Sequence, residues 1–373
     1  MDSKALSSSI AKFSVKFFNE LNKSKSVVAS PLSAEYILAL VALGCEGPAH
    51  TEILQSLGFP EDDAIRSSFS NMSSQLKSIK GITLNVANKV YIQDGDYKLN
   101  NNLENDAVKV FDAGLEKINF GSHGAAQTIN KWVESKTNAR IKDLLTSDSV
   151  DSDTRLVLVN ALYFKGSWLK PFNKMMTMDR PFHLDESTTV DIPMMEGKEN
   201  FFYGESKDLG VQYLKMQYEG KEASMLIVLP EQINGLNDVL KKLADGYDLI
   251  ADVEKLVDTK VDVTIPKFKI ETEIDLIEIL KKLGISTIFD SNNSGLTKML
   301  DSDEKLYVSK GVQKAFIEVN EEGAEAAAAS AFGVMMCSAI MEPPRPYFNA
   351  DRAFLAVILV GNDVYFTASF RGK

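Results

Sequence analysis

The sequence predicts a single α+β domain. Apolar residues recur at helical spacing through much of the first half, whereas the second half carries short runs rich in β-branched and aromatic residues. No linker, repeat or change of composition divides the two halves. With 373 residues, 45% of them hydrophobic and 25% charged, the chain can bury a sizeable core. We therefore expect residues 1–373 to form one domain.

Four stretches predict helices. Apolar residues between 10 and 21 fall at helical spacing. Residues 30–47 begin with a serine cap and a proline in the first turn, and they end at glycines. Residues 128–145 have an amphipathic pattern, and residues 275–284 end on a C-terminal glycine.

Strands are predicted mainly after residue 150. Residues 154–164, 223–230 and 311–319 are short apolar runs rich in β-formers, and residues 260–270 alternate apolar and polar side chains. Residues 353–370 read as two strands around a Gly-Asn-Asp turn, which predicts a hairpin.

Charge and hydropathy exclude several classes of partner. The net charge is −11, so we expect no nucleic-acid partner, because phosphate binding needs a dominant basic surface. No run of about 18 apolar residues is present, so we expect no membrane partner. The first residues lack the apolar core of a signal peptide. The protein would be intracellular if Met1 is the natural start, and extracellular if a signal segment has been removed.

Catalytic and cofactor motifs are missing from the sequence. The chain has no nucleotide-binding glycine motif, no hydrolase nucleophile motif and no zinc motif. Its three histidines, His50, His123 and His183, are not joined by ligand spacing. Cys45 and Cys337 lie far apart, and a nucleophile pair of Cys337 with a histidine has no supporting signature. We expect no enzyme activity, no metal and no cofactor.

The stretch from Asn320 to Gly333, "NEEGAEAAAASAFG", is ambiguous. Its alanines and glutamates favour a helix, yet it follows a predicted strand and precedes the proline-rich run "EPPRPYF". Residues 314–329, "KAFIEVNEEGAEAAAA", resemble the hinge of serpins, and of insect serpins in particular. Further matches follow in family order. They are "ASPLS" (29–33), "INKWVESKTNARIKDLL" (129–145), "VNALYFKGSW" (159–168), "MLIVLP" (225–230), "IPKFKIETEIDL" (265–276) and "FNADRAF" (348–354).

The resemblance implies a serpin fold with three β-sheets, eight to nine helices and an exposed reactive loop at about residues 322–346. It also implies a monomeric suicide inhibitor that forms a covalent or tight 1:1 complex with a target protease. The protease would cleave the loop, which would then insert into the main sheet as a new strand. The alternative is a non-inhibitory serpin that serves as a chaperone, carrier or storage protein.

The residues of the expected hinge suit insertion as a strand. An inserting strand must contain no proline and little bulk, and the side chains from Ala324 to Ala328 on alternate positions are all small. Glu325 falls on the opposite face, and Gly323 can adopt unusual backbone angles at the turning point. The hinge comprises Glu322, Gly323, Ala324, Glu325, Ala326, Ala327, Ala328 and Ala329.

Family spacing places the cleaved bond between Cys337 and Ser338, with Met336 in the subsite before the cut. Because the loop is somewhat long, Met335, Met336, Ser338 and Ile340 remain alternatives. No Lys or Arg occurs between Ala324 and Glu342, so we expect no trypsin-like target. Elastase-like or chymotrypsin-like serine proteases and papain-like cysteine proteases remain open.

Two further groups of residues carry over from the family by resemblance. Ser30, Ser33, Asn160 and Gln313 match the polar cluster that controls opening of the main sheet, with Gln313 standing in place of the usual histidine. Trp168, Lys267 and Glu321 match the breach at the top of that sheet, where the resemblance implies an ion pair between Lys267 and Glu321.

Overall fold

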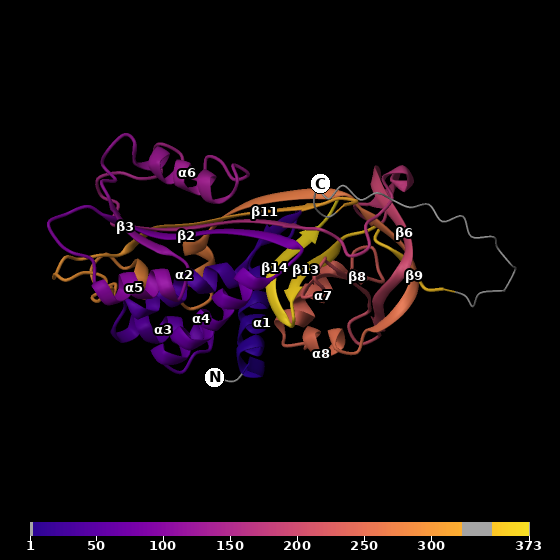
Figure 1. Ribbon diagram of the computed structural model, residues 1–373, viewed down its shortest axis with the longest axis horizontal. Helices are drawn as coiled ribbons and strands as arrows, with labels where there is room; N and C mark the ends of the chain where they lie inside the picture. The colour runs from indigo at the N-terminus through magenta and orange to yellow at the C-terminus, as the bar shows by residue number, and fades with distance from the viewer. Residues whose placement is uncertain (1–2, 323–344, 373) are drawn as a thin grey trace, which may run out of the picture.

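The structure is a computed structural model that describes residues 3–322 and 345–372 (Figure 1). Within these two ranges the chain forms nine α-helices and two short 3₁₀ helices. The α-helices are α1 (Ser3–Asn19), α2 (Pro31–Leu43), α3 (Gly47–Leu57), α4 (Asp62–Ser78), α5 (Asn101–Lys109), α6 (Ala125–Lys136), α7 (Leu236–Ala244), α8 (Leu249–Val253) and α9 (Leu276–Lys282). The 3₁₀ helices are η1 (Lys174–Met176) and η2 (Thr287–Phe289).

Fourteen strands accompany these helices in the described part of the chain. They are β1 (Val27–Ala29), β2 (Ile82–Gln93), β3 (Gly114–Ile118), β4 (Leu156–Gly166), β5 (Met178–His183), β6 (Thr189–Ser206), β7 (Val211–Gln217), β8 (Ala223–Pro230), β9 (Val257–Pro266), β10 (Phe268–Asp275), β11 (Val308–Val319), β12 (Tyr347–Asn349), β13 (Phe354–Val360) and β14 (Asp363–Phe370).

Among the described residues the strands pair into two sheets. The smaller has five strands in the order β10-β11-β4-β2-β3, and the larger has the order β1-β14-β13-β8-β7-β6-β9-β12, with β5 paired to β6. The long strand β6 pairs with β9 through residues 194–203 and with β7 through residues 202–206. The α+β class and the number of helices agree with the expectation. The resemblance implies three sheets, but among the described residues β6 pairs with both β7 and β9 and so joins their strands into the one larger sheet.

The five-stranded sheet is covered on both faces. Figure 1 shows α2 on one side of the long strands and α6 on the other. In β4, Leu156, Leu158 and Leu162 join the main core around α2, while the intervening Val157 and Val159 join a second core beneath α6. This alternation follows from the two-residue period of a strand. It explains why the sequence of β4 is apolar at almost every position.

Helix α2 is buried along its whole length, which explains its nearly continuous apolar sequence. The Ser30 hydroxyl caps its first turn by accepting a hydrogen bond of 3.3 Å from the Ser33 amide, and Pro31 occupies the first helical position. The predicted cap and proline are therefore confirmed. The helix ends at Leu43, and the next helix begins at Gly47.

The helix predicted over residues 128–145 was wrong at its C-terminal end, because α6 stops at Lys136. Asn138 and Ala139 adopt positive φ angles of 51° and 54°, which an α-helix does not tolerate. The Asn130 side chain explains the change of direction. It accepts from the Leu145 amide and donates to the Leu145 carbonyl, each at 2.8 Å, and so holds the following segment folded back against α6.

The alternating run 260–270 was also misread as one strand. It divides into β9 in the larger sheet and β10 in the smaller, with Lys267 between them. Pro266 cannot donate a ladder hydrogen bond and ends β9. The other strand predictions and the 353–370 hairpin are confirmed, with Gly361 at φ 58° in the turn. Helix α9 is capped by Asp275, and Gly284 follows at φ 88° as expected.

Candidate functional site

The centre of the five-stranded sheet is the parallel pair of β4 and β11. Their register runs from Val308 opposite Leu156 to Ile317 opposite Phe164. Strand β11 ends at Val319 and leads into Glu321 and Glu322, beyond which the description stops. Glu322 is therefore the one expected hinge residue that the structure places. The others, from Gly323 to Ala329, and the reactive-bond candidates Met335, Met336, Cys337, Ser338 and Ile340 lie outside the described residues.

Three buried amide side chains lie in a row across strands β11, β4 and β2. Gln313 of β11 lies opposite Asn160 of β4, and Asn160 lies opposite Asn88 of β2. Gln313 and Asn160 are fully buried, and Asn88 is 3% exposed. All three lie on the α2 side of the sheet, since each alternates with residues that pack under α6. Buried amides of this kind need partners on every side.

Gln313 joins β11 to both the helix cap and β4. Its side-chain oxygen accepts from the Ser30 amide at 2.9 Å, and its side-chain nitrogen donates to the Ser30 carbonyl at 2.9 Å. The same nitrogen donates to the Asn160 side-chain oxygen at 2.5 Å. The Gln313 side chain thus acts as donor and acceptor at once. The Ser30 hydroxyl donates to the Tyr365 carbonyl at 2.6 Å and so ties the cap to β14.

Asn160 and Ser33 complete the network on the other side. The Asn160 side-chain nitrogen donates to the Ser33 hydroxyl at 2.6 Å and to the Asn88 side-chain oxygen. The Ser33 hydroxyl donates to Asn88 as well, at 3.2 Å. The structure therefore brings together all four residues predicted for this cluster. Asn88 belongs to it too and was missed, because only the register of β2 against β4 reveals its place.

The breach residues surround the end of β11. The Trp168 indole donates to the Asn320 carbonyl at 2.9 Å, and the Trp168 amide donates to the Glu322 carbonyl at 3.1 Å. The indole also stacks on Tyr218 with the ring centres 4.4 Å apart. Trp168 thus holds the residues that lead into the expected hinge. Glu322 also forms an ion pair of 2.5 Å with Lys174 of η1.

The expected ion pair between Lys267 and Glu321 is present at 3.0 Å. Glu321 is 4% exposed and also accepts a hydrogen bond of 2.8 Å from the Thr177 hydroxyl. Burial raises the pKa of Glu321, but hydrogen bonds from its own amide, Thr177 and Lys267 outweigh burial, and the pKa lies below its ordinary value. Thr177 was missed by sequence reasoning, since a lone threonine after a turn carries no signal of its own.

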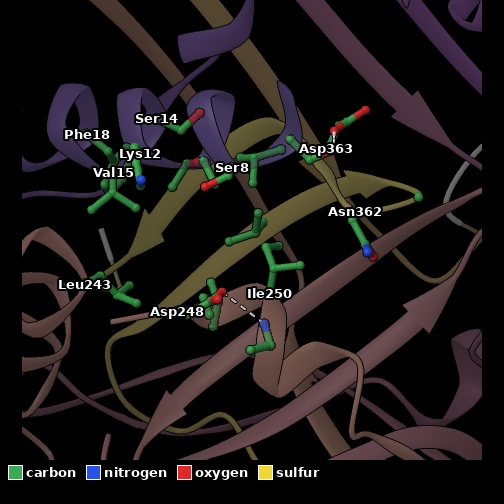
Figure 2. A pocket seen from close by; sticks show the side chains of 18 of the residues that line it. Ser8, Lys12, Ser14, Val15, Phe18, Leu243, Asp248, Ile250, Asn362 and Asp363 are labelled. Atoms are coloured by element: carbon green, nitrogen blue, oxygen red, sulfur yellow. Dashed lines mark hydrogen bonds between the residues drawn. The ribbon is translucent and has the colours of Figure 1, made fainter. Parts of the chain in front are cut away.

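A larger cavity of about 1360 Å³ lies away from this site, between α1, α7, α8 and the β13–β14 hairpin (Figure 2). Several of its polar groups support local structure. Asp363 accepts from the Ser7 hydroxyl at 2.5 Å, and Asp248 caps α8 by accepting from the Ala251 amide at 3.0 Å. Of the described residues that line it, none is a histidine or a cysteine.

His50 and Cys45 both lie in structural settings. The His50 ring nitrogen lies 2.7 Å from the Asp62 carboxylate, which is an ordinary helix-to-helix contact. Burial raises the pKa of the free Cys45 thiol well above its ordinary value, and such a thiol is unreactive. Residues 3–322 and 345–372 contain no group of His, Cys, Asp and Glu side chains that could hold a metal. No described helix is long and apolar enough to cross a membrane.

Comparison with known proteins identifies relatives along nearly the whole chain. Residues 8–370 match the family described as serpin (serine protease inhibitor). Antitrypsin of Bombyx mori is 41% identical over 362 residues, which cover 96% of this chain and 92% of the relative. Antichymotrypsin-2 of the same organism is 42% identical, with 92% of each chain covered. The crystal structure of Serpin48 of Tenebrio molitor has a TM-score of 0.90 at 31% identity, covering 100% of this chain and 99% of its own.

The family match covers residues 8–370. This range includes the central parallel pair of strands, the buried polar cluster on the α2 side of the sheet and the breach at the end of β11. The family description and the names of these relatives are those of protease inhibitors and not of enzymes. The chain belongs to the serpin family.

Proposed function

We propose that this serpin inhibits its target protease as a suicide substrate, by cleavage of a reactive loop that then inserts between β4 and β11. The observation that supports this most directly is the continuity of the chain. Strand β11, one partner of the central parallel pair, ends at Val319, and the chain continues through Glu321 and Glu322 into residues Gly, Ala, Glu and Ala. That segment could fold back antiparallel to both strands, since it has no proline and little bulk.

The energy of insertion is sufficient to make the process one-way. About a dozen new ladder hydrogen bonds at a net ~0.5–1.5 kcal/mol each give on the order of 10 kcal/mol. That value is comparable to the whole stability of an ordinary domain. The intact form would therefore be kinetically trapped. About fourteen inserted residues at ~3.3 Å each would carry an attached protease roughly 45 Å along the sheet.

The contacts of the proposed breach and sheet-opening cluster would keep the sheet closed in the intact form. Insertion must separate Asn160 from Gln313, and it must release the contacts that Trp168, Lys267 and Thr177 make with residues 320–322. Each contact is a local hydrogen bond or ion pair, so the barrier would fall as they are lost one by one.

The target is proposed to be a serine protease with an elastase-like or chymotrypsin-like pocket. The proposed reactive bond is Cys337–Ser338, and no basic residue occurs from Ala324 to Glu342 for a trypsin-like pocket to bind. One relative bears the name antichymotrypsin and another the name antitrypsin, so family membership alone leaves the pocket open. Met336 before the proposed bond keeps papain-like cysteine proteases as the second class.

The test is to mix the protein with chymotrypsin, elastase, trypsin and a papain-like protease in turn. An inhibitor of a serine protease gives a covalent complex on a denaturing gel and abolishes activity at 1:1 titration. Mass spectrometry of the released C-terminal peptide identifies the cleaved bond, and a peptide beginning at Ser338 would support the proposed one.

A hinge variant supplies the matched control for this test. Ala326→Pro should leave the cleavage site intact but block insertion, so the loop should be cut without loss of protease activity. If the unaltered protein is also cut at the loop while every protease stays active, inhibition is refuted. The non-inhibitory alternative, a chaperone, carrier or storage protein, would then stand.

A further inference from the structure

A second, smaller cavity of about 190 Å³ lies beside the breach. It is bounded by the segment that follows β4, by β6, β7 and β9, and by the turn between β7 and β8. Its volume is below the ~300–1,000 Å³ of sites that enclose cofactors or drug-sized molecules. It is well above the ~10–15 Å³ that a single water requires. The cavity therefore suits a small ion with its hydration water.

The lining of this cavity is positively charged in a chain whose net charge is −11. Lys170, Lys215 and Lys221 line it against one acid, Asp258, so three positive charges face one negative charge. Asp258 is exposed, and water screens its charge more than that of a half-buried group. Converging lysines of this kind concentrate anions locally even when the whole molecule is acidic.

Lys215 is the distinctive member of the three. It belongs to β7 and is half-buried, with its ammonium 6.0 Å from the centre of the Phe202 ring. Among the described residues it has no carboxylate and no hydrogen-bond acceptor within bonding distance. Burial lowers the pKa of Lys215, and no neighbouring charge offsets that effect. A half-buried ammonium without an acceptor is unfavourable, and a bound anion would remove the deficit.

Lys170 is already placed for the same purpose. Its ammonium donates to the Asn200 carbonyl at 2.8 Å, which fixes the side chain at the cavity while leaving two further donors. Lys221 lies in the turn between β7 and β8 and is exposed. One lysine is therefore held by the backbone, one is half-buried without an acceptor, and one is free to adjust.

We propose that this cavity binds a small oxyanion of the phosphate or sulfate type through Lys170, Lys215 and Lys221. The cavity is adjacent to the breach because Trp168 also lines it. The same residue donates from its indole nitrogen to the Asn320 carbonyl at 2.9 Å. A bound oxyanion would therefore stabilise Trp168 in the position that keeps residues 320–322 in place.

The test uses Trp168 as its own reporter. The chain has two tryptophans, so Trp132→Phe leaves Trp168 as the single tryptophan. Sodium phosphate and sodium sulfate are titrated separately into the intact protein, with sodium chloride adjusting ionic strength to a constant value. A saturable change of Trp168 fluorescence in the millimolar range is expected for both anions, and chloride alone should give none. O-phosphoserine, titrated in the same way, distinguishes a free anion from one carried on a larger molecule.

Variants decide whether the lysines make the site. Lys215→Met, which keeps the apolar stem, should weaken phosphate binding about tenfold or more, the fold-change that corresponds to loss of one charged hydrogen bond. Lys215→Arg should keep binding, and this variant also guards against a fold defect in the methionine variant. Lys131→Met, which removes an exposed lysine from α6, should leave the affinity unchanged. The absence of a saturable change, or equal affinities in Lys215→Met and the parent, overturns the proposed site.

A second measurement tests the link to the breach. It rests on the proposed inhibitory function, whereas the titration of the intact protein does not. Saturating phosphate should slow inhibition of the target protease in the parent and leave the rate unchanged in Lys215→Met. Binding with no effect on the rate would refute the coupling to Trp168, and failure to inhibit any protease would refute the proposed function while leaving the anion site intact.

Discussion

Gln313 and Asn160 face each other across the parallel strands β4 and β11, and the Gln313 amide donates a hydrogen bond of 2.5 Å to the Asn160 side-chain oxygen. Both residues are fully buried. Any process that separates the two strands must break this bond in an apolar surrounding, where an unmade hydrogen bond is most costly. The pair therefore couples the stability of the intact fold to the ease with which its main sheet opens.

Replacing Gln313 by leucine should weaken the fold and ease opening of the sheet. The change leaves the Ser30 amide and the Asn160 side-chain oxygen without their partner. It also removes one of the two donors to the Ser30 carbonyl, which keeps its hydrogen bond from the Ala34 amide. Each buried group left without a partner costs about 1–3 kcal/mol. We expect a lower denaturant midpoint and, if the loop inserts as proposed, a faster rate of inhibition.

The matched control for that change is Gln127→Leu, since Gln127 is an exposed residue of α6. A surface substitution of this kind should change the free energy of unfolding by less than about 0.5 kcal/mol. The role of Gln313 is contradicted if the two leucine variants unfold at the same denaturant concentration.

Lys267→Met should destabilise the breach in a pH-dependent way. The pKa of Glu321 is depressed in the folded state, so its contribution to stability is present above the unfolded pKa of about 4.3 and is lost as the pH falls through the folded pKa. Without Lys267 the depression shrinks. The variant should therefore be less stable than the parent near neutral pH, and the difference should narrow as the pH falls below about 4.3.

The size of that effect is limited because the Lys267 side chain is 42% exposed. After allowance for solvent screening we expect about 1 kcal/mol near neutral pH. Melting curves of both proteins between neutral and acidic pH measure it. Glu321→Gln offers the second arm, since it removes the titrating group and should flatten the same part of the curve. Parallel curves for parent and Lys267→Met would exclude the ion pair as a source of stability.

The sequence predicted the elements of this fold better than their boundaries. The alternation in 260–270 was correctly seen as β structure, but only pairing shows that Pro266 divides it between two sheets. The end of α6 depends on a contact between Asn130 and Leu145, fifteen residues apart, which helical periodicity cannot reveal. Boundaries were missed where a tertiary hydrogen bond overrides local propensity.

The candidate site shows the same division. Family resemblance grouped Ser30, Ser33, Asn160 and Gln313, which are spread over most of the chain, and their contacts agree with that grouping. Asn88 and Thr177 were outside the resemblance. Their places follow from strand register and from the path of the chain after η1, neither of which is encoded by local pattern.

Glu35→Gln should stabilise the fold near neutral pH. Glu35 of α2 is fully buried, and neither carboxylate oxygen has a hydrogen-bond partner among the described residues. Burial, and then the charge of Asp363, raise the pKa of Glu35 well above its ordinary value. The folded state thus keeps a proton that the unfolded state releases, so stability falls as the pH rises above the unfolded pKa of about 4.3.

The glutamine variant lacks this proton and should lose the corresponding pH dependence. The glutamine amide stays neutral at every pH, whereas the carboxyl of the parent costs more to keep protonated as the pH rises, so the gain over the parent should grow with pH. Glu219→Gln serves as the control, since Glu219 is exposed at the turn between β7 and β8. The melting temperatures of the parent and of Glu35→Gln are compared at about pH 5 and about pH 8. If the difference between the two proteins is the same at both pH values, Glu35 does not titrate as described.

Val133→Ala tests whether α6 must yield when the sheet opens. Val133 is fully buried in the second core, where α6 packs on Val157 and Val159 of β4 and on Val312 of β11. A strand entering between β4 and β11 would spread this surface beneath the helix. Removing two methyl groups should cost about 1–3 kcal/mol of stability. If α6 must lift before insertion, the rate of inhibition should rise, whereas Lys131→Ala on its exposed face should change neither quantity. Lower stability with an unchanged rate would mean that α6 keeps its packing while the strand enters, and the barrier would then lie in the polar cluster and the breach.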